Sequence, residues 1–142
     1  MRFIIIRKAD AETEAEGDVP APSVELLEAM GTYNQSMIDA GVMIDGAGLR
    51  PSTHGFRFSF ENGEPTIIDG PFAEAKELVA GFTIIEVASP QEAIEWVKKW
   101  PKEDGHGNVQ LELRRLWEME DFDETIAKSE KYAESGFPDI AN

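Results

Sequence analysis

Apolar and polar residues alternate in short runs along the first 117 residues of the chain. Residues 3–6 form an apolar run between two arginines, and residues 81–87 form a second run, so both segments predict central strands. Phe56, Phe58 and Phe60 alternate with polar residues. The Asn62-Gly63 dipeptide that follows is typical of a tight turn, so residues 56–60 and 65–68 predict a β-hairpin. Residues 108–117 alternate again and predict the last core strand.

Two segments have the spacing of helices. Leu26, Met30, Tyr33 and Met37 recur at intervals of four, three and four, and they predict a helix that begins after Ser23 and ends near residue 41. The run Ser89-Pro-Gln-Glu92 predicts a second helix start, with a serine cap, proline in the first turn and a capping box. Between the first helix and the hairpin, the two glycines of residues 46–48 indicate a turn.

The order of these elements is β-α-β-β-β-α-β, which predicts an α+β fold. This order matches a ferredoxin-like split βαβ with an inserted β-hairpin, formed by residues 1–117. Helices would cover one face of the sheet, and the other face also carries apolar residues that need cover. A second copy is the simplest cover, which predicts a homodimer, a dimeric α/β barrel. The acidic tail, residues 118–142, is the alternative cover and is expected to be partly helical.

Charge is concentrated in two segments. The formal net charge is −15, and 13 of the 28 acidic residues lie in residues 9–22 and 118–142. These acids are expected to be solvated, and their field disfavours binding to nucleic acid or to anionic membranes. The chain has no cysteine, no apolar run long enough to span a membrane and no signal peptide at its start, which together predict a cytoplasmic protein.

The densest group of functional residue types is the block Asp69-Gly-Pro-Phe-Ala-Glu-Ala-Lys-Glu77. It lies between two predicted strands, where loops of α+β domains usually carry function. Asp69 has two interpretations, because a carboxylate at a strand exit can cap backbone N–H groups or serve a site. Glu74 and Lys76 are open to the same two interpretations, as a solvated turn or as ligand contacts.

Two histidines are present, in separate turns. Pairing of the hairpin across residues 62–63 would bring His54 near Asp69, and a carboxylate there would raise the proton affinity of the histidine. A solvent-facing histidine at a strand start is the alternative. His106 is expected in a flexible loop. Since the two lack the spacing of a metal-ligand set, neither a metal site nor a cofactor is predicted.

Several segments together resemble the YCII-related family in its DGPF branch. They are Ala40-Gly-Val, Gly48-Leu-Arg-Pro51, the block at 69–77, Gly81-Phe, Ala93-Ile-Glu-Trp96 and Leu111-Glu-Leu-Arg114. The resemblance covers residues 1–117 and implies a dimeric ferredoxin-like barrel. Some relatives are enzymes that act on small ring compounds with a His–Asp pair, and genes of the branch often neighbour extracytoplasmic-function sigma factors. The helical histidine of the family has no counterpart here, where Tyr33 is the only titratable ring of the first predicted helix.

Two functions follow from these residues. The first is a small-molecule-binding or regulatory dimer, with a sigma factor as a possible functional partner. The alternative is a cofactor-independent enzyme that performs acid–base chemistry of a lyase or isomerase type on a small ring compound or acid. In the enzyme, Asp69 and His54 would be catalytic. The ligand-binding candidates of either function are Arg50, Tyr33, Glu74 and Lys76.

Overall fold

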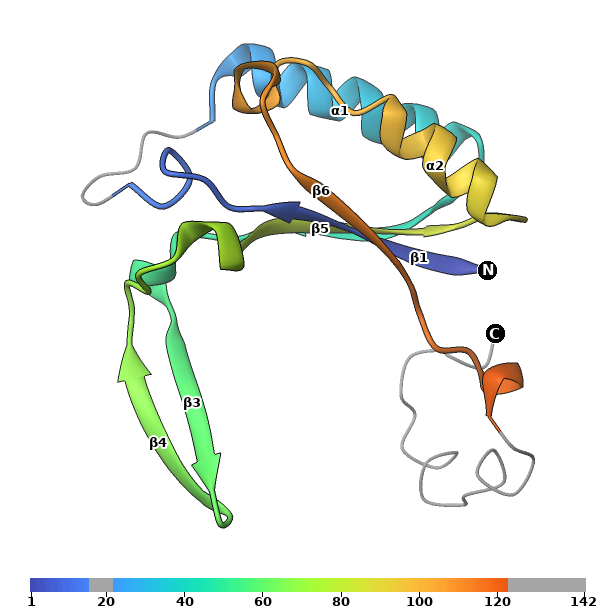
Figure 1. The fold of residues 1–142 in the computed structure, drawn as a ribbon. Helices are drawn as coiled ribbons and strands as arrows, with labels where there is room; N and C mark the ends of the chain where they lie inside the picture. Colours follow the sequence, from blue (N-terminus) through green and yellow to red (C-terminus); the bar gives the residue numbers. More distant parts are fainter. Residues whose placement is uncertain (16–21, 123–142) are drawn as a thin grey trace.

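Two helices cover one face of a four-stranded antiparallel sheet, and a separate hairpin projects from the opposite side (Figure 1). The computed structural model describes residues 1–15 and 22–122. The strands are β1 (Arg2–Lys8), β2 (Met43–Gly48), β3 (Phe56–Glu61), β4 (Glu64–Asp69), β5 (Val79–Glu86) and β6 (Leu111–Arg115). The helices are α1 (Val24–Asp39) and α2 (Pro90–Lys98), with short 3-10 helices η1 (Ser52–His54), η2 (Ala75–Glu77), η3 (Asp104–Gly107) and η4 (Met119–Asp121). The α+β prediction is confirmed.

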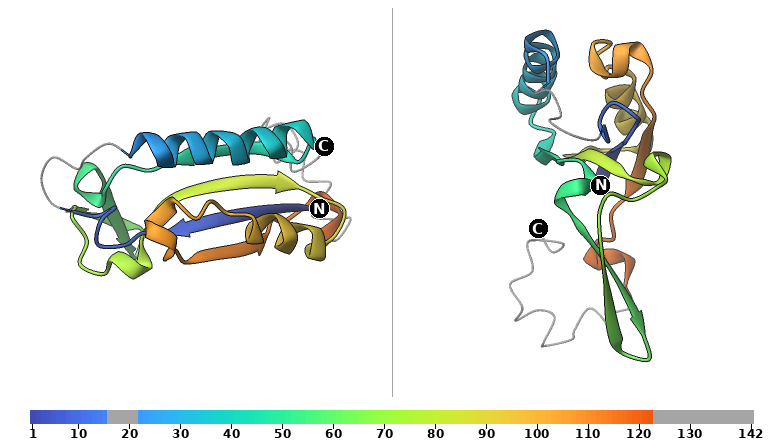
Figure 2. Two further views of the ribbon diagram at one scale, coloured as in Figure 1. Left: turned by 90° about the horizontal axis from the view of Figure 1, so that it is seen from above. Right: turned by 90° about the vertical axis from the view of Figure 1, so that its left-hand side faces the viewer.

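The sheet has the strand order β2-β5-β1-β6, with β1 and β5 in its centre. Phe3 and Ile5 of β1 are buried on the helix-covered face, where they join Met37 of α1 and Ala93 of α2 in one core cluster. Both helices lie along this face when the molecule is seen from above (Figure 2). The core therefore lies between the helices and the sheet.

Serine caps begin both helices as the sequence predicts. The Ser23 side chain accepts the Leu26 N–H, and that of Ser89 accepts the Glu92 N–H. The predicted capping box at α2 differs by one residue, because the Glu92 carboxylate accepts the N–H of Ala88 in place of that of Ser89. The helix α1 ends as predicted, since Gly41 has a φ of 72°, which favours glycine.

The expected turn at residues 46–48 is wrong, because these residues belong to strand β2 at the edge of the sheet. Gly46 lies against the central strand: a Cβ there would stand 3.1 Å from the carbonyl oxygen of Phe82. Gly46 thus allows close approach of two strands. Glycine within a strand often marks such an approach, whereas the local pattern of two glycines predicts a turn.

The hairpin β3–β4 forms as predicted, with Asn62 and Gly63 both at positive φ in its turn. It pairs with no strand of the larger sheet, and every residue of both its strands is exposed. The phenylalanines at 56, 58 and 60 are 57–68% exposed.

The structure describes the two acidic segments to different extents. Residues 123–142, and with them nearly all of the predicted acidic tail, lie outside the described residues. The first segment is described up to residue 15, and it is not simply solvated: Ala9 is buried, and three of its acids make specific contacts with the body. Among the described residues, no helix has the length and apolarity that crossing a membrane requires.

Candidate functional site

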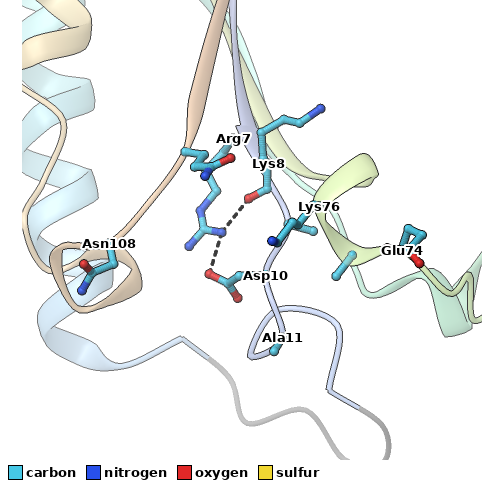
Figure 3. Close-up of a pocket in the computed structure, with 10 residues that line it drawn as sticks. Arg7, Lys8, Asp10, Ala11, Glu74, Lys76 and Asn108 are labelled. Atoms are coloured by element: carbon cyan, nitrogen blue, oxygen red, sulfur yellow. Dashed lines mark hydrogen bonds and ion pairs between the residues drawn. The ribbon is translucent and has the colours of Figure 1, made fainter.

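A cleft of about 410 Å³ opens where the end of β1 meets η2 and the chain before β6 (Figure 3). We call it the β1–η2 cleft. Backbone hydrogen bonds hold its walls: the Lys8 N–H donates to the Gln110 carbonyl over 3.0 Å, and the Ala9 N–H donates to the Leu78 carbonyl over 2.9 Å. Its lining residues are Arg7, Lys8, Ala9, Asp10, Ala11, Glu74, Ala75, Lys76, Asn108 and Gln110.

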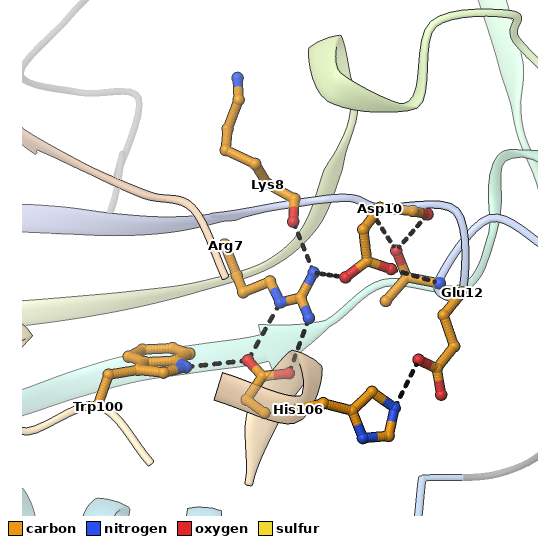
Figure 4. A network of polar contacts seen from close by, with 8 residues as sticks. Arg7, Lys8, Asp10, Glu12, Trp100 and His106 are labelled. Carbon is orange, nitrogen blue, oxygen red and sulfur yellow. Dashed lines mark hydrogen bonds and ion pairs between the residues drawn. The ribbon is translucent and has the colours of Figure 1, made fainter. Parts of the chain in front are cut away.

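Arg7 is the centre of a buried polar network beside the cleft (Figure 4). Its guanidinium forms a two-pronged pair with Asp104, from Nε to Oδ2 over 3.1 Å and from Nη2 to Oδ1 over 2.8 Å. Trp100 Nε1 donates to the same carboxylate over 2.9 Å. Arg7 and Asp104 are only 6% and 8% exposed, so each ion needs the other to offset its loss of water.

The fourth contact of this network is Asp10, at the mouth of the cleft. Arg7 Nη1 donates to its Oδ2 over 3.0 Å, and the Thr13 N–H donates to its Oδ1 over 2.9 Å. Burial raises the pKa of Asp10, but the bonds from Thr13 and Arg7 outweigh it and the net pKa is lowered. For Arg7, the hydrogen bond to Asp104 raises the pKa beyond its ordinary value. Both groups are therefore held in their charged forms, and Asp10 is a poor proton acceptor.

Lys76 supplies available positive charge to the cleft. It lies on η2 and forms no ion pair with another residue in the part of the chain that the structure describes. The Lys8 carbonyl accepts Arg7 Nη1 over 2.7 Å, and the Lys8 side chain points away from Arg7 and Asp10 (Figures 3 and 4). The amide side chains of Asn108 and Gln110 complete the polar lining. Cations next to amide groups suit a small anionic molecule. Residues 1–15 and 22–122 contain no cluster of three or more His, Cys, Asp or Glu side chains that could hold a metal ion.

Of the residues that the sequence singled out, Glu74 and Lys76 line the cleft. Arg50, His54 and Asp69 do not; they lie at the base of the hairpin, and all three are exposed. The hairpin register pairs Asp69 with Phe56, and His54 belongs to η1. No hydrogen bond or ion pair joins His54 to Asp69 within residues 1–15 and 22–122.

Tyr33 lies in the core between the two helices. It is 6% exposed, its hydroxyl donates to the Trp96 carbonyl over 2.7 Å, and its ring meets that of Trp100 edge to face. Burial raises its pKa to about 12. In this position the phenol is a structural donor that stays protonated at neutral pH.

The first residues of the 69–77 block fasten the hairpin to the body. The Gly70 N–H donates to the Gly55 carbonyl over 3.0 Å, and a Cβ on Gly70 would overlap the Ser52 carbonyl oxygen. The Phe72 N–H donates to Ser52 Oγ, while the hydroxyl of Ser52 donates to the Glu14 carboxylate over 2.6 Å. This corner therefore joins three segments: the acidic N-terminal segment, η1 and the block.

Sequence reasoning missed Arg7, Asp104, Asn108 and Gln110. One signal was present, because Arg7 continues the odd-numbered positions of Phe3 and Ile5, which face the core. A charged residue at an inward position requires a buried partner. His106 also differs from its expected flexible loop: it lies in η3 at a φ of 55°, and its Nε2 is 3.0 Å from the Glu12 carboxylate.

The family follows from comparison with known proteins. Residues 1–115 match the model of the YCII-related domain. The chain belongs to the YCII-related family. An uncharacterized protein of Rhizobium meliloti (strain 1021) is 32% identical over 73 residues, which are 51% of this chain and 59% of that relative, so the match spans about three fifths of the relative's length. A solved structure of a 5-chloro-2-hydroxyhydroquinone dehydrochlorinase from Burkholderia phenoliruptrix AC1100, in complex with 2,5-dihydroxybenzoquinone, is 16% identical with a TM-score of 0.44. The match covers 87% of this YCII-related chain and 100% of that one.

Proposed function

We propose that this YCII-related protein is a small-molecule-binding or regulatory dimer whose ligand is a small anion held in the β1–η2 cleft. The observation that carries the proposal is the presence of Lys76 in one cleft with the amide residues Asn108 and Gln110. The Lys76 ammonium group has no ion-pair partner among the described residues and attracts a carboxylate or phosphate, and amide groups fix the orientation of such an anion.

We further propose that the protein belongs to the DGPF branch and forms a ferredoxin-like dimeric barrel in the cytoplasm, functionally linked to an extracytoplasmic-function sigma factor. The strand order β2-β5-β1-β6 with helices on one face supports the barrel, because it leaves the second face of each sheet for a partner.

A thermal-shift screen against small carboxylic, phenolic and phosphorylated metabolites tests the ligand site. A ligand at about 100 times its dissociation constant stabilises the fold by ~2.7 kcal/mol, which is a readily measured shift in melting temperature. We expect the shift to disappear in Lys76→Gln and to persist in Lys98→Gln, a matched change on the exposed face of α2. A shift of the same size in all three proteins would remove the cleft as the site.

The same screen separates the cleft from the base of the hairpin. If Asp69→Asn and His54→Ala abolish a shift that Lys76→Gln leaves intact, the ligand binds at the hairpin base with Arg50, and the acid–base enzyme becomes the better proposal. Product analysis of each ligand after incubation with the protein then reports turnover. A ligand that is recovered unchanged supports the binding protein.

A further inference from the structure

The hairpin has one face that is almost entirely apolar. Residues paired directly across an antiparallel hairpin share a face, and the register pairs Phe58 with Ile67 and Phe60 with Pro65. Phe56 lies on the same side, next to these pairs, and its partner Asp69 places one carboxylate on this face at the base of the hairpin. The opposite face carries the polar residues Arg57, Ser59, Glu61, Glu64 and Thr66, together with Ile68. We call the first surface the phenylalanine face.

Nothing in the described part of the chain covers this face. The three phenylalanines are 57–68% exposed and Ile67 is 60% exposed. A two-stranded hairpin by itself is marginally stable in water, and contiguous exposed apolar surface of this kind marks an interaction site.

The chain carries a second uncovered apolar surface. On the sheet face away from the helices, the register places Ile4 opposite Ile84 and Ile6 opposite Phe82, and all four are half-buried in the single chain. We call these four residues the open sheet face. The hairpin projects on this same side of the sheet (Figures 1 and 2).

The hairpin stands away from the open sheet face of its own chain (Figures 1 and 2). The two ends of the hairpin are joined at its base by the Gly70–Gly55 and Phe72–Ser52 hydrogen bonds, and the Arg57 guanidinium lies 4.1 Å from the centre of the Phe72 ring. The Ser52 hydroxyl also donates to the Glu14 carboxylate, which links this base to the N-terminal segment. The hairpin points into the space that a second copy would occupy on this side of the sheet.

We infer that the phenylalanine face of each hairpin packs against the open sheet face of a second copy of this chain, so that the hairpins form two arms of one symmetric interface. The areas agree with this occupant. Aromatic side chains bury ~150–250 Å² each, so three phenylalanines at these exposures offer about 300–450 Å². Ile67, Pro65 and the open sheet face add to this toward the ~800 Å² per partner of a standard interface. The inference rests on the dimer of the proposed function and adds which surfaces form it.

Photo-cross-linking tests the contact directly. Benzoylphenylalanine replaces Phe58, which keeps an aromatic ring in place, and this unlabelled protein is mixed with an excess of ¹⁵N-labelled wild-type chain. We expect cross-links from residue 58 to labelled peptides of β1 and β5. Cross-links to the labelled hairpin, to residues 123–142, or within the unlabelled chain would overturn the inference.

Dimer affinity supplies the second arm of the test. By sedimentation equilibrium, Phe58→Asp is expected to weaken the dimer at least about 30-fold, as loss of a central aromatic anchor does. Ser59→Asp adds the same charge at the neighbouring position on the polar face and is expected to change the affinity less than about threefold. If Phe58→Asp and Ser59→Asp weaken the dimer equally, the inference about the hairpin is overturned, but the proposed dimer is not. A wild-type chain that is monomeric at high concentration would overturn both the dimer and the inference.

Discussion

The β1–β5 pair and the β3–β4 pair are both antiparallel, both rich in large apolar residues, and they differ completely in burial. Phe3 and Ile5 of β1 are buried beneath two helices, whereas Phe58 of β3, which alternates with polar residues, is 57% exposed. Alternation thus reveals which side chains share a face, and burial depends on whether another layer covers that face. In this chain the helices supply one cover, and we propose that a second copy supplies the other.

Replacing one arginine in each region is expected to give the largest difference in the free energy of unfolding. Arg7→Ala leaves the buried Asp104 carboxylate without its ion-pair partner and is expected to lower the free energy of unfolding by ~3–5 kcal/mol. Arg57→Ala removes a contact with the Phe72 ring on the exposed hairpin and is expected to cost ~0.5–1 kcal/mol. Urea unfolding measures both.

A double variant is the control for the larger effect. In Arg7→Met with Asp104→Asn, both charges are gone and the asparagine oxygen can still accept the Trp100 N–H. Because the penalty comes from an unpaired buried charge, this variant should recover most of the loss. Similar losses in Arg7→Ala and Arg57→Ala would contradict the difference in burial between the two regions.

The junction between the regions is expected to be the next most sensitive place. In Gly70→Ala the new Cβ overlaps the Ser52 carbonyl oxygen, so η1 must shift, and overpacking of this kind costs ~1–3 kcal/mol. Gly48→Ala is the matched control, since a Cβ there meets nothing within 4 Å. We expect that variant to stay within ~0.5 kcal/mol of the wild type in thermal or urea unfolding. Equal stability of the two variants would mean that Gly70 does not fix the hairpin base.

Most of the fold was predictable because its signals are local. Ser23 and Ser89 indicate the helix starts, and Asn62-Gly63 indicates the hairpin turn, each from a few neighbouring residues. Strand β2 was missed because Gly46 serves a close approach to β5, more than 30 residues away, that no local pattern encodes.

The site was less predictable for the same physical reason. Glu74 and Lys76 were found because they belong to one distinctive block. The Arg7–Asp104 pair spans 97 residues, and the contact of Glu12 with His106 spans 94. Such pairs exist only once the strands have brought η3 beside the end of β1. The acids of the first segment therefore looked like a solvated charge cluster.

The hydrogen bond from Tyr33 of α1 to Trp96 of α2 is expected to contribute less to stability, and its contribution can be tested by changing the pH. Tyr33→Phe removes the donor to the Trp96 carbonyl and should cost ~1 kcal/mol at neutral pH. Because burial raises the pKa of Tyr33 from 10.0 to about 12, the unfolded chain loses this proton first. The contribution of Tyr33 is therefore full below pH 10 and declines as the pH rises from 10 to about 12.

Unfolding curves measured across this range check the sign. The wild type should lose stability more steeply than Tyr33→Phe between pH 10 and 12, so the two free energies of unfolding should converge. Parallel curves would show that the phenol titrates in the fold as it does in the unfolded chain.

The smallest effect is expected at the exposed counterpart of the Arg7 pair. Glu12 and His106 join the same two segments as Arg7 and Asp104, but their side chains are 66% and 81% exposed, so water screens the contact. His106→Asn tests it cleanly, because asparagine tolerates the left-handed backbone that His106 adopts. We expect the free energy of unfolding to change by less than ~0.5 kcal/mol, and raised salt to change the difference little. A loss that approaches the one for Arg7→Ala would mean that the N-terminal segment is held by its outer contact. The wall of the cleft would then depend on the exposed Glu12–His106 contact. The buried Arg7–Asp104 pair predicts instead that the N-terminal segment stays in place when that contact is removed.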